Sequence, residues 1–230
     1  MKKIYKMAVI SFALAFAACD DSAAASENGD DDSNVACTDE PVDCPSIFVE
    51  NAVHDSRDCH WYKVAEFGTQ TWMIENLSYN SCHLKGQTWC YDGNGANCEQ
   101  YGRLYTWTAV MGLEKTYQKN YANATAPTSG ICPSGYHVPS DAEWQMLFDF
   151  IDGNGGDATA FNFQYSGEKS FAGYSDLGRK AFFWTASEDT NPEPIGGPGN
   201  AIIWTYTDTF GFGGGSVMKD SGLSVRCVKD

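Results

Sequence analysis

Basic residues are scarce in this chain. It has 15 Lys and Arg against 30 Asp and Glu, which gives a formal net charge of −15. Such an excess of negative charge repels nucleic acids, so we expect no nucleic-acid partner. The sequence also lacks a GxSxG elbow, an HExxH pair and a Walker A loop, which are signatures of serine hydrolases, zinc peptidases and nucleotide hydrolases. We therefore expect no enzyme activity and assign no catalytic residue.

Metal-binding motifs are absent or incomplete. No paired CxxC motif occurs, and the dipeptides Cys59-His60 and Cys82-His83 lack the spacing of zinc ligands. The acidic loops that begin at Asp92 and Asp152 fit only part of the calcium-binding pattern of an EF-hand. We expect no metal and no other cofactor, with calcium as the alternative that these loops leave open.

A long apolar run occurs at the start of the chain. Three lysines at positions 2, 3 and 6 precede the run Met7–Ala18, which is short for a membrane span. Two alanines then precede Cys19, an arrangement that resembles a bacterial lipobox. This resemblance implies a lipoprotein signal peptide over residues 1–18 and a lipid on Cys19, which would anchor the protein to the membrane. An ordinary signal peptide with an incidental cysteine is the alternative. We expect an exported protein at the outer membrane or cell surface rather than at the inner membrane.

Lysine and arginine are missing from Asp20 to Glu50. This stretch is rich in Asp, Glu, Ser, Ala and Asn, which offer little apolar surface to bury. We therefore predict an acidic, flexible tether over residues 19–52. Residues 53–230 are long enough to form one domain with its own core.

Nine cysteines are present, and eight remain once Cys19 is set aside. An even number suits the oxidising surroundings of an exported protein. Eight cysteines allow 105 pairings, and we favour pairs that close short loops, together with one that joins the middle of the chain to its end. The expected disulfides are Cys37–Cys44, Cys59–Cys82, Cys90–Cys98 and Cys132–Cys227.

The segment Gly130–Ile151 carries the clearest helix signal. Ser140 and Glu143 form a capping box, and Pro139 marks the entry to the helix. Apolar residues then recur at helical spacing, at Trp144, Leu147, Phe148 and Ile151. This stripe predicts a helix that faces the core.

The other elements are shorter. Residues 101–113 predict a second helix, and residues 61–76 predict a hairpin with its turn at Gly68-Thr69. Beyond residue 151 we expect short strands at 160–165, 181–187, 201–210 and 223–228. The glycines at 211–215 predict a turn or a bulge. The sequence alone thus predicts two helices, a hairpin and several short strands.

Five segments together resemble a known family. They occur in the order YKVAEFGTQTWMIENLSY, CYDGNGANCEQYGRLYTWTAVMG, GICPSGYHVPSDAEWQMLFDFI, FFWTASE and GLSVRCVKD. This series, over about residues 55–230, is similar to the Fibrobacter succinogenes major paralogous domain. The resemblance implies an α+β, C-type lectin-like fold with two helices and small antiparallel sheets, which formylglycine-generating enzymes share. The disulfides expected above would staple this fold. An enzyme of that type needs a reactive cysteine pair, which an even set of disulfide-bonded cysteines does not leave.

A binding role fits the many tryptophans. We expect four of the seven, at positions 72, 107, 144 and 184, to lie in the core. Trp89 and Trp204 are better candidates for a ligand-binding surface. Loops carry binding residues more often than the scaffold does, so the Pro- and Gly-rich stretch 188–200 adds three acidic candidates: Glu188, Asp189 and Glu193.

Calcium-dependent lectins of this fold carry a Glu-Pro-Asn or Gln-Pro-Asp triplet and a Trp-Asn-Asp triplet, and neither triplet is complete here. Glu193-Pro194 is followed by Ile195, and Trp204 is followed by Thr205. Adjacent strand residues point to opposite faces, so Glu188 and Asp189 do not form a catalytic carboxylate pair.

We predict an envelope-anchored binding or adhesion module that recognises a polysaccharide or another envelope protein. A purely structural domain without a small ligand is the alternative. His137, at the entry to the central helix, is expected to be a structural hydrogen-bonding residue.

Overall fold

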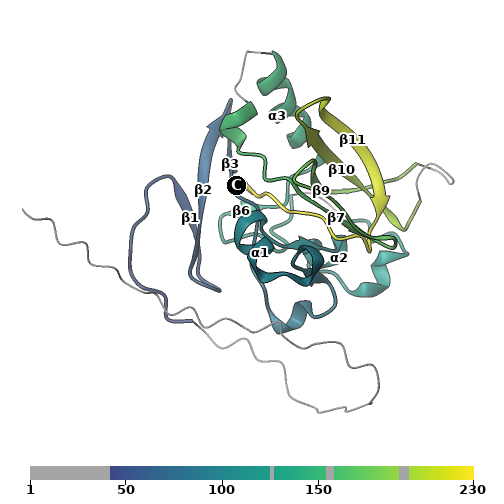
Figure 1. Cartoon of the computed structure of the whole chain (residues 1–230), viewed down its shortest axis with the longest axis horizontal. Helices are drawn as coiled ribbons and strands as arrows, with labels where there is room; N and C mark the ends of the chain where they lie inside the picture. The colour runs from purple at the N-terminus through teal and green to yellow at the C-terminus, as the bar shows by residue number, and fades with distance from the viewer. Residues whose placement is uncertain (1–41, 125–126, 154–157, 192–196) are drawn as a thin grey trace, which may run out of the picture. The chain divides into compact units, whose positions relative to one another are not determined.

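The computed structural model describes residues 42–124, 127–153, 158–191 and 197–230, which fall within one compact unit, Asn34–Asp230 (Figure 1). The signal peptide, Cys19, Cys37 and Glu193 lie outside these residues. The described part contains three α-helices: α1 (Gly95–Tyr101), α2 (Trp107–Met111) and α3 (Asp141–Gly153). Short 3-10 helices cover Cys82–Leu84, Tyr91–Gly93, Lys115–Gln118 and Ala158–Phe161. None of the helices in these ranges is both long and apolar enough to cross a membrane.

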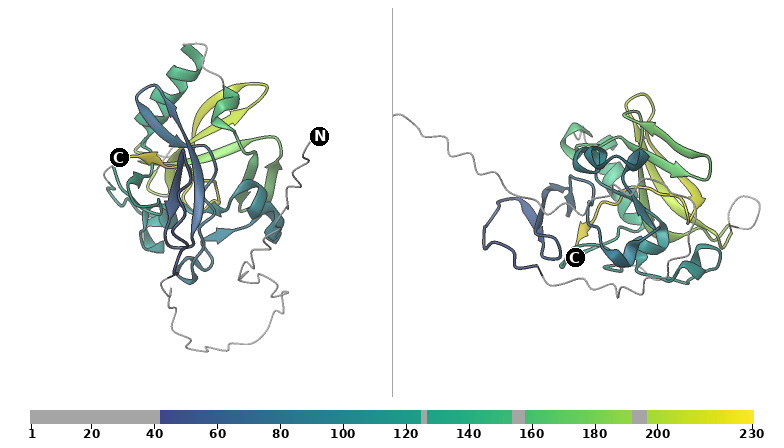
Figure 2. Two further views of the ribbon diagram at one scale, coloured as in Figure 1. Left: turned by 90° about the vertical axis from the view of Figure 1, so that its left-hand side faces the viewer. Right: turned by 60° about the horizontal axis from the view of Figure 1, so that its bottom comes forward.

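A five-stranded antiparallel sheet brings distant parts of the chain together. It consists of β1 (Ala52–Asp55), β2 (His60–Phe67), β3 (Gln70–Met73), β12 (Val228–Lys229) and β6 (Tyr136–His137), in the order β1-β2-β3-β12-β6. The β2–β3 hairpin with its turn at Gly68-Thr69 confirms the prediction. Because β12 pairs with both β3 and β6, the end of the chain joins the central strand β6 to the β1–β3 part of the sheet. The left panel of Figure 2 faces the β1–β2 hairpin, with the C-terminus beside it.

A second sheet lies against α3. Its strands are β9 (Ala181–Glu188), β10 (Asn200–Thr207) and β11 (Gly211–Met218), in the order β11-β10-β9. Figure 1 shows α3 above the ends of β10 and β11, and α3 contacts β9 and β10. Two small ladders complete the described strands: β4 (Thr88–Trp89) with β5 (Leu104–Tyr105), and β7 (Ser166–Ser170) with β8 (Gly173–Leu177).

Aromatic side chains dominate the core, as the sequence predicted. Four tryptophans are fully buried: Trp72, Trp107, Trp144 and Trp184. Trp72 and Trp144 pack with ring centroids 4.8 Å apart, and Phe161 meets both rings edge-on. Each buried indole removes roughly 150–250 Å² from water, which offsets the small area that such short helices supply.

Arg226 is also fully buried, within this aromatic core. Its guanidinium donates to Asn76 Oδ1 (2.6 Å) and to the backbone carbonyl of Phe161 (2.8 Å), and it lies 4.8 Å from the Phe161 ring. Burial lowers its pKa to about 9. The charge is solvated by neutral acceptors and a ring face, so Arg226 links the last part of the chain to the core.

The start of α3 is capped as the sequence predicted. Ser140 N donates to Glu143 Oε2 (2.8 Å), and Glu143 N donates to Ser140 Oγ (3.3 Å). His137 hydrogen-bonds Glu143 and Asp230 through its two ring nitrogens, each at 2.8 Å. Burial opposes the charged imidazolium, but these two carboxylates outweigh it and raise the pKa of His137. His137 is thus a hydrogen-bonding residue that joins the helix start to the end of the chain.

Two of the four expected disulfides are confirmed. They are Cys132–Cys227, which we call the hub disulfide, and Cys90–Cys98, the α1 disulfide. The pairs Cys37–Cys44 and Cys59–Cys82 are wrong, because Cys44 bonds to Cys59 in what we call the hairpin disulfide. Cys59 lies in the turn between β1 and β2, which brings its Cα within 5.3 Å of that of Cys44. Cys82 is also disulfide-bonded, so none of the seven cysteines in the described ranges is a free thiol.

Several predicted elements are corrected. Residues 101–113 do not form one helix, because Gly102 (φ +75°) ends α1 and a short strand, β5, precedes α2. The expected count of two helices therefore becomes three within the described ranges. The expected strand at 160–165 is irregular after a 3-10 helix, and strand structure near the end of the chain is limited to β12 and isolated bridges. The glycines at 211–215 lie in strand β11, because β10 supplies their hydrogen-bond partners.

Candidate functional site

A groove lies between the start of α3 and one face of the β9–β11 sheet. Its volume is about 550 Å³. We call it the α3–β10 groove and define it by its lining residues: Asp141, Gln145, Asp189, Asn191, Ile202, Trp204, Gly214, Gly215 and Ser216. It brings together Asp189 and Trp204, two of the residues that the sequence suggested for ligand binding.

Strand register determines one wall of the groove. Ile202 pairs with Ser216, and Trp204 pairs with Gly214. Directly opposed residues on neighbouring antiparallel strands project to the same face. Gly214 has no side chain there, and a Cβ added to it would meet nothing within 4 Å. The sheet is therefore bare beside the tryptophan.

The indole of Trp204 is held from the helix side. Its Nε1 donates to Asp141 Oδ1 (2.8 Å), and its ring packs on Phe148 of α3 with centroids 5.9 Å apart. Trp204 is only 6% exposed, so the prediction of a surface tryptophan is wrong, because α3 covers the ring. The groove meets a small part of the ring rather than a whole face. Gln145 follows Asp141 by one helical turn and adds an exposed amide to the same rim.

Asp189 follows the end of β9 and is 1% exposed. Its Oδ1 accepts hydrogen bonds from the backbone N (2.9 Å) and Nδ2 (2.8 Å) of Asn191. Burial raises the pKa of Asp189, but the nearby Ser216 hydroxyl and these N–H groups outweigh it, so the pKa lies below its usual value. Asp189 Oδ2 and Ser216 Oγ are enclosed, and neither completes a hydrogen bond of good geometry. The groove wall therefore contains an ionised carboxylate with unused acceptor capacity.

Glu188 points away from the groove. Its Oε1 accepts from Lys219 Nζ (2.5 Å) and from the backbone N of Ala122 (2.9 Å). Burial opposes ionisation, but these donors lower the pKa of Glu188. Lys219 is 0% exposed and lies 4.6 Å from the Trp107 ring centroid. The structure places Glu188 in a buried ion pair, on the side of the strand opposite Asp189.

Trp89 lies apart from the groove. Lys169 Nζ is 4.3 Å from its ring centroid, and a Cβ on Gly222 would come within 3.0 Å of the ring. A lysine and a backbone segment therefore already contact this indole. Trp89 remains an untested prediction, as does Glu193, which lies outside the described residues.

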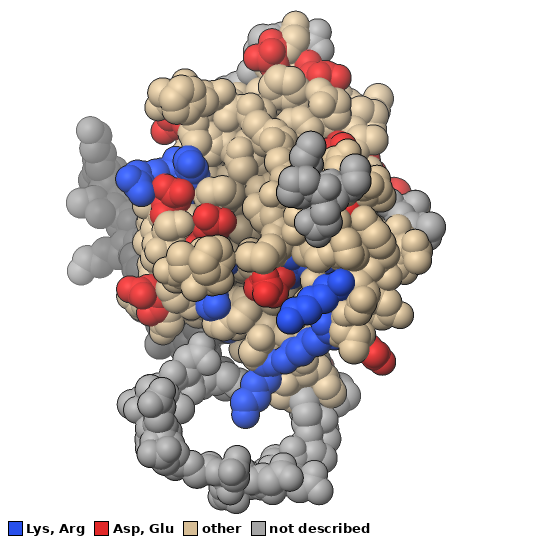
Figure 3. All heavy atoms as spheres, turned by 90° about the vertical axis from the view of Figure 1, so that its right-hand side faces the viewer, with Lys and Arg blue, Asp and Glu red and all other residues tan. Residues whose placement is uncertain are grey.

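Seven groove residues were not predicted as ligand-binding residues from the sequence, namely Asp141, Gln145, Asn191, Ile202, Gly214, Gly215 and Ser216. The alternation of residues along 200–207 could have placed Ile202 beside Trp204. No sequence signal places α3 over that face, because the contact is tertiary. The surface that carries β11 is mostly neither acidic nor basic, as Figure 3 shows from that side.

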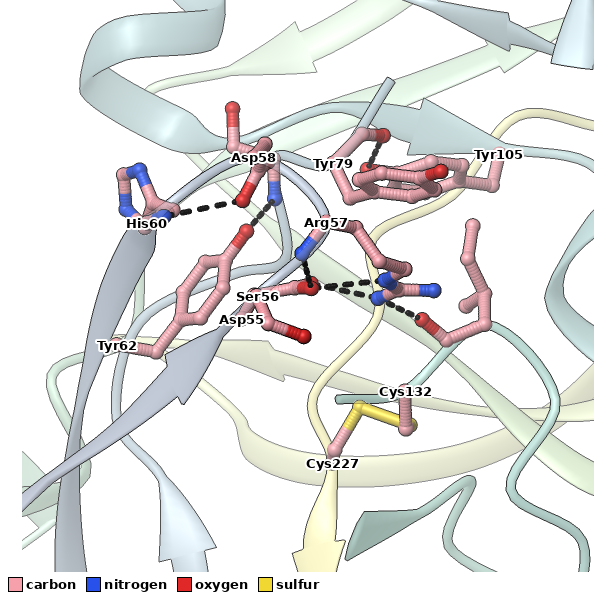
Figure 4. Close-up of polar contacts among 12 residues, drawn as sticks. Asp55, Ser56, Arg57, Asp58, His60, Tyr62, Tyr79, Tyr105, Cys132 and Cys227 are labelled. Carbon is pink, nitrogen blue, oxygen red and sulfur yellow. Dashed lines mark hydrogen bonds and ion pairs between the residues drawn. A yellow bond between two sulfur atoms is a disulfide. The ribbon is translucent and has the colours of Figure 1, made fainter. Parts of the chain in front are cut away.

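A second polar cluster ties the β1–β2 turn to the hub disulfide (Figure 4). Asp55 is buried and accepts from Arg57 Nε (2.8 Å) and Nη2 (2.6 Å). Arg57 Nη2 also donates to the carbonyl of Ile131 (2.8 Å), next to Cys132, and the guanidinium lies 3.9 Å from the Tyr79 ring centroid. Burial opposes the charge of Arg57, but Asp55 raises its pKa. The polar groups of this cluster hydrogen-bond one another and hold the β1–β2 turn against the segment at Ile131.

One cysteine–histidine group has the spacing of metal ligands. Within the described residues, ligand atoms of Cys44, His54 and Cys59 lie within 4.8 Å of one another. The two sulfurs are bonded in the hairpin disulfide, so neither is the thiolate that a metal requires. While the two cysteines are joined in a disulfide, this group does not fit a metal ion.

Residues 65–158 match the family described as the Fibrobacter succinogenes major domain. The match begins in β2 and includes α1, α2 and α3. It therefore includes the helix side of the α3–β10 groove but not the β9–β11 side. We found no significant match among curated proteins or solved structures. Residues 65–158 thus match the Fibrobacter succinogenes major domain, which confirms the resemblance predicted from the sequence motifs in that range.

Proposed function

We propose that this protein is a non-catalytic binding module of the cell envelope that recognises a polysaccharide through the α3–β10 groove. The observation that carries the proposal is the composition of the groove. An indole edge and a bare strip of sheet lie among amide, hydroxyl and carboxylate groups. Sugars present apolar C–H surfaces ringed by hydroxyl groups, and such a lining matches both.

The size of the groove supports a small ligand segment. Its volume of about 550 Å³ falls within the range of roughly 300–1,000 Å³ that is typical of small-molecule sites. A protein partner instead covers roughly 800 Å² of a flatter surface. A few sugar units of a longer chain fit the groove better than another envelope protein does.

The proposal includes the location and architecture of the module. A lipid on Cys19 would hold it to the outer membrane or cell surface, and the acidic tether would separate it from the bilayer. We also retain the C-type lectin-like architecture, because the final strand pairs with early and central strands of the chain. No cofactor is required, and calorimetry at millimolar calcium tests the calcium alternative.

A structural domain without a ligand is the second candidate. It is favoured by the four fully buried tryptophans, which show that most indoles serve the core. Under this alternative, filling the groove changes no interaction with polysaccharide.

The test fills the groove without disturbing the fold. Gly214→Val places a side chain where a Cβ meets nothing within 4 Å, on the face of Trp204. Gly215→Val is the matched control: Gly215 lines the groove only with backbone atoms, and its added side chain would lie on the opposite face of the sheet, with its Cβ at an ordinary 3.7 Å from Ile203. Both replace glycine by a residue that favours strands, so both are expected to fold.

The assay is retention on insoluble cellulose, chitin, xylan and peptidoglycan. We expect the wild type and Gly215→Val to be retained on at least one polymer, and Gly214→Val to lose at least tenfold in affinity, about 1.4 kcal/mol. Binding that is unaffected by Gly214→Val would place the ligand elsewhere. Absence of binding by the wild type to every polymer would favour the structural alternative.

A further inference from the structure

The charged residues that line the α3–β10 groove are all negative. Two carboxylates, Asp141 and Asp189, are among its nine lining residues, and no Lys or Arg is. Asp141 is exposed at the start of α3, whereas Asp189 is enclosed just beyond the end of β9. Any ligand in the groove therefore meets negative charge from both the helix side and the sheet side of the lining.

The charge of Asp189 is stabilised by neutral groups. The two Asn191 donors bind its Oδ1, while Oδ2 completes no hydrogen bond of good geometry. The nearby Ser216 hydroxyl and the two Asn191 N–H groups oppose the effect of burial on its ionisation, and no cation contributes. An enclosed carboxylate without a cationic partner is costly. Glu188, one residue earlier, has such a partner in Lys219.

A positively charged ligand group would supply what the groove lacks. An ammonium has three N–H donors and no acceptor. It can contact the exposed Asp141 directly, and Asp189 attracts it through the poorly screened wall. The bare strip at Gly214 leaves room for the sugar ring that carries the ammonium.

From these observations, and resting on the proposed function, we propose that the α3–β10 groove selects polysaccharides that carry protonated amino groups, such as glucosamine polymers, over neutral or N-acetylated polymers of the same backbone. The selective feature is the presence of two carboxylates, Asp141 and Asp189, and no cation in the groove lining. Polymers that carry carboxylates or sulfates are excluded by the same charge.

The test compares three β-1,4-linked pentasaccharides that differ at carbon 2: an amine, an N-acetyl group or a hydroxyl. Binding is measured by calorimetry at a mildly acidic pH, where the amines are protonated and Asp189 is ionised. We expect the amine form to bind about tenfold more tightly than the hydroxyl form, as one partly screened ion pair provides. Raising the salt concentration should reduce this preference.

Variants locate the preference. Asp189→Asn and Asp141→Asn keep the shape of the side chain and remove one charge each, so either should reduce the preference severalfold while leaving affinity for the hydroxyl form within about twofold. Asp152→Asn, at the exposed far end of α3 and outside the groove lining, is the control that should change nothing. Circular dichroism checks folding, and the salt titration of the wild type tests the charge effect without any variant.

The outcomes separate this inference from the proposed function. Equal binding of all three sugars, or a preference that both groove variants retain, would overturn the amine selectivity and leave polysaccharide binding standing. Failure of all three sugars to bind, together with failure on the insoluble polymers, would overturn both. Binding of a lysine-rich peptide with no binding of any sugar would also overturn both, in favour of a protein ligand.

Discussion

The hub disulfide should stabilise this fold more than either of the other two described disulfides. The hub, hairpin and α1 disulfides join cysteines 95, 15 and 8 residues apart. A disulfide lowers the entropy of the unfolded chain more as its loop lengthens, which for these loops corresponds to about 4.7, 3 and 2.5 kcal/mol. Removing the hub disulfide should therefore lower the free energy of unfolding by about 2 kcal/mol more than removing the α1 disulfide.

The assay is guanidinium denaturation of paired Cys→Ala variants, with C132A/C227A compared against C90A/C98A. All four sulfurs are buried, so the packing lost is similar and the difference reports loop closure. We expect the hub variant to have the lowest transition midpoint, with a steeper slope because its unfolded chain is no longer held compact by the cross-link. An α1 variant as unstable as the hub variant would refute the reasoning that the hub disulfide holds the end of the chain to the central segment.

Two further predictions concern the start of α3 and the turn before it. His137→Gln should lower the free energy of unfolding most near about pH 5.5, where both the imidazolium and the Glu143 carboxylate are charged. Because the pKa of His137 is raised in the folded state, its imidazolium stabilises the fold below the unfolded pKa, and this stabilisation is lost as the pH rises through the folded pKa. Urea titrations should therefore show the stability difference between wild type and variant shrinking toward about pH 9. A stability difference that stays constant with pH would contradict this prediction. Gly130→Ala should cost at least about 2 kcal/mol, because its Cβ would lie 2.2 Å from Val110 O at φ +48°. Gly135→Ala, also at positive φ but with nothing within 4 Å, should cost only about 1 kcal/mol in thermal unfolding; equal losses would count against the close approach at Gly130.

Local signals in the sequence were sufficient where the structure is locally determined. The capping box of Ser140 and Glu143 involves residues three apart, so it can be recognised without knowing the fold. The same holds for the β2–β3 hairpin, whose turn is marked by Gly68-Thr69. The opposite directions of Glu188 and Asp189 also followed from strand alternation alone.

Tertiary pairing explains the failures. Strand β11 contains four glycines among its first five residues, so it has no apolar pattern, and it is a strand because β10 pairs with it. The hairpin disulfide depends on the β1–β2 turn, which the preference for short loops did not consider. Trp204 could be named as a surface candidate, but its partners Asp141 and Gly214 come from a helix and a strand that only folding brings together.

The most direct test of the central claim is a two-dimensional NMR titration of the seven indole N–H signals with a bound oligosaccharide. Trp204 Nε1 bonds Asp141 within the α3–β10 groove, so its signal should shift with saturable dependence on ligand. The signals of the four buried indoles and of Trp89 should stay in place. A shift of the Trp89 signal with Trp204 unmoved would contradict the account and place the binding site outside the groove.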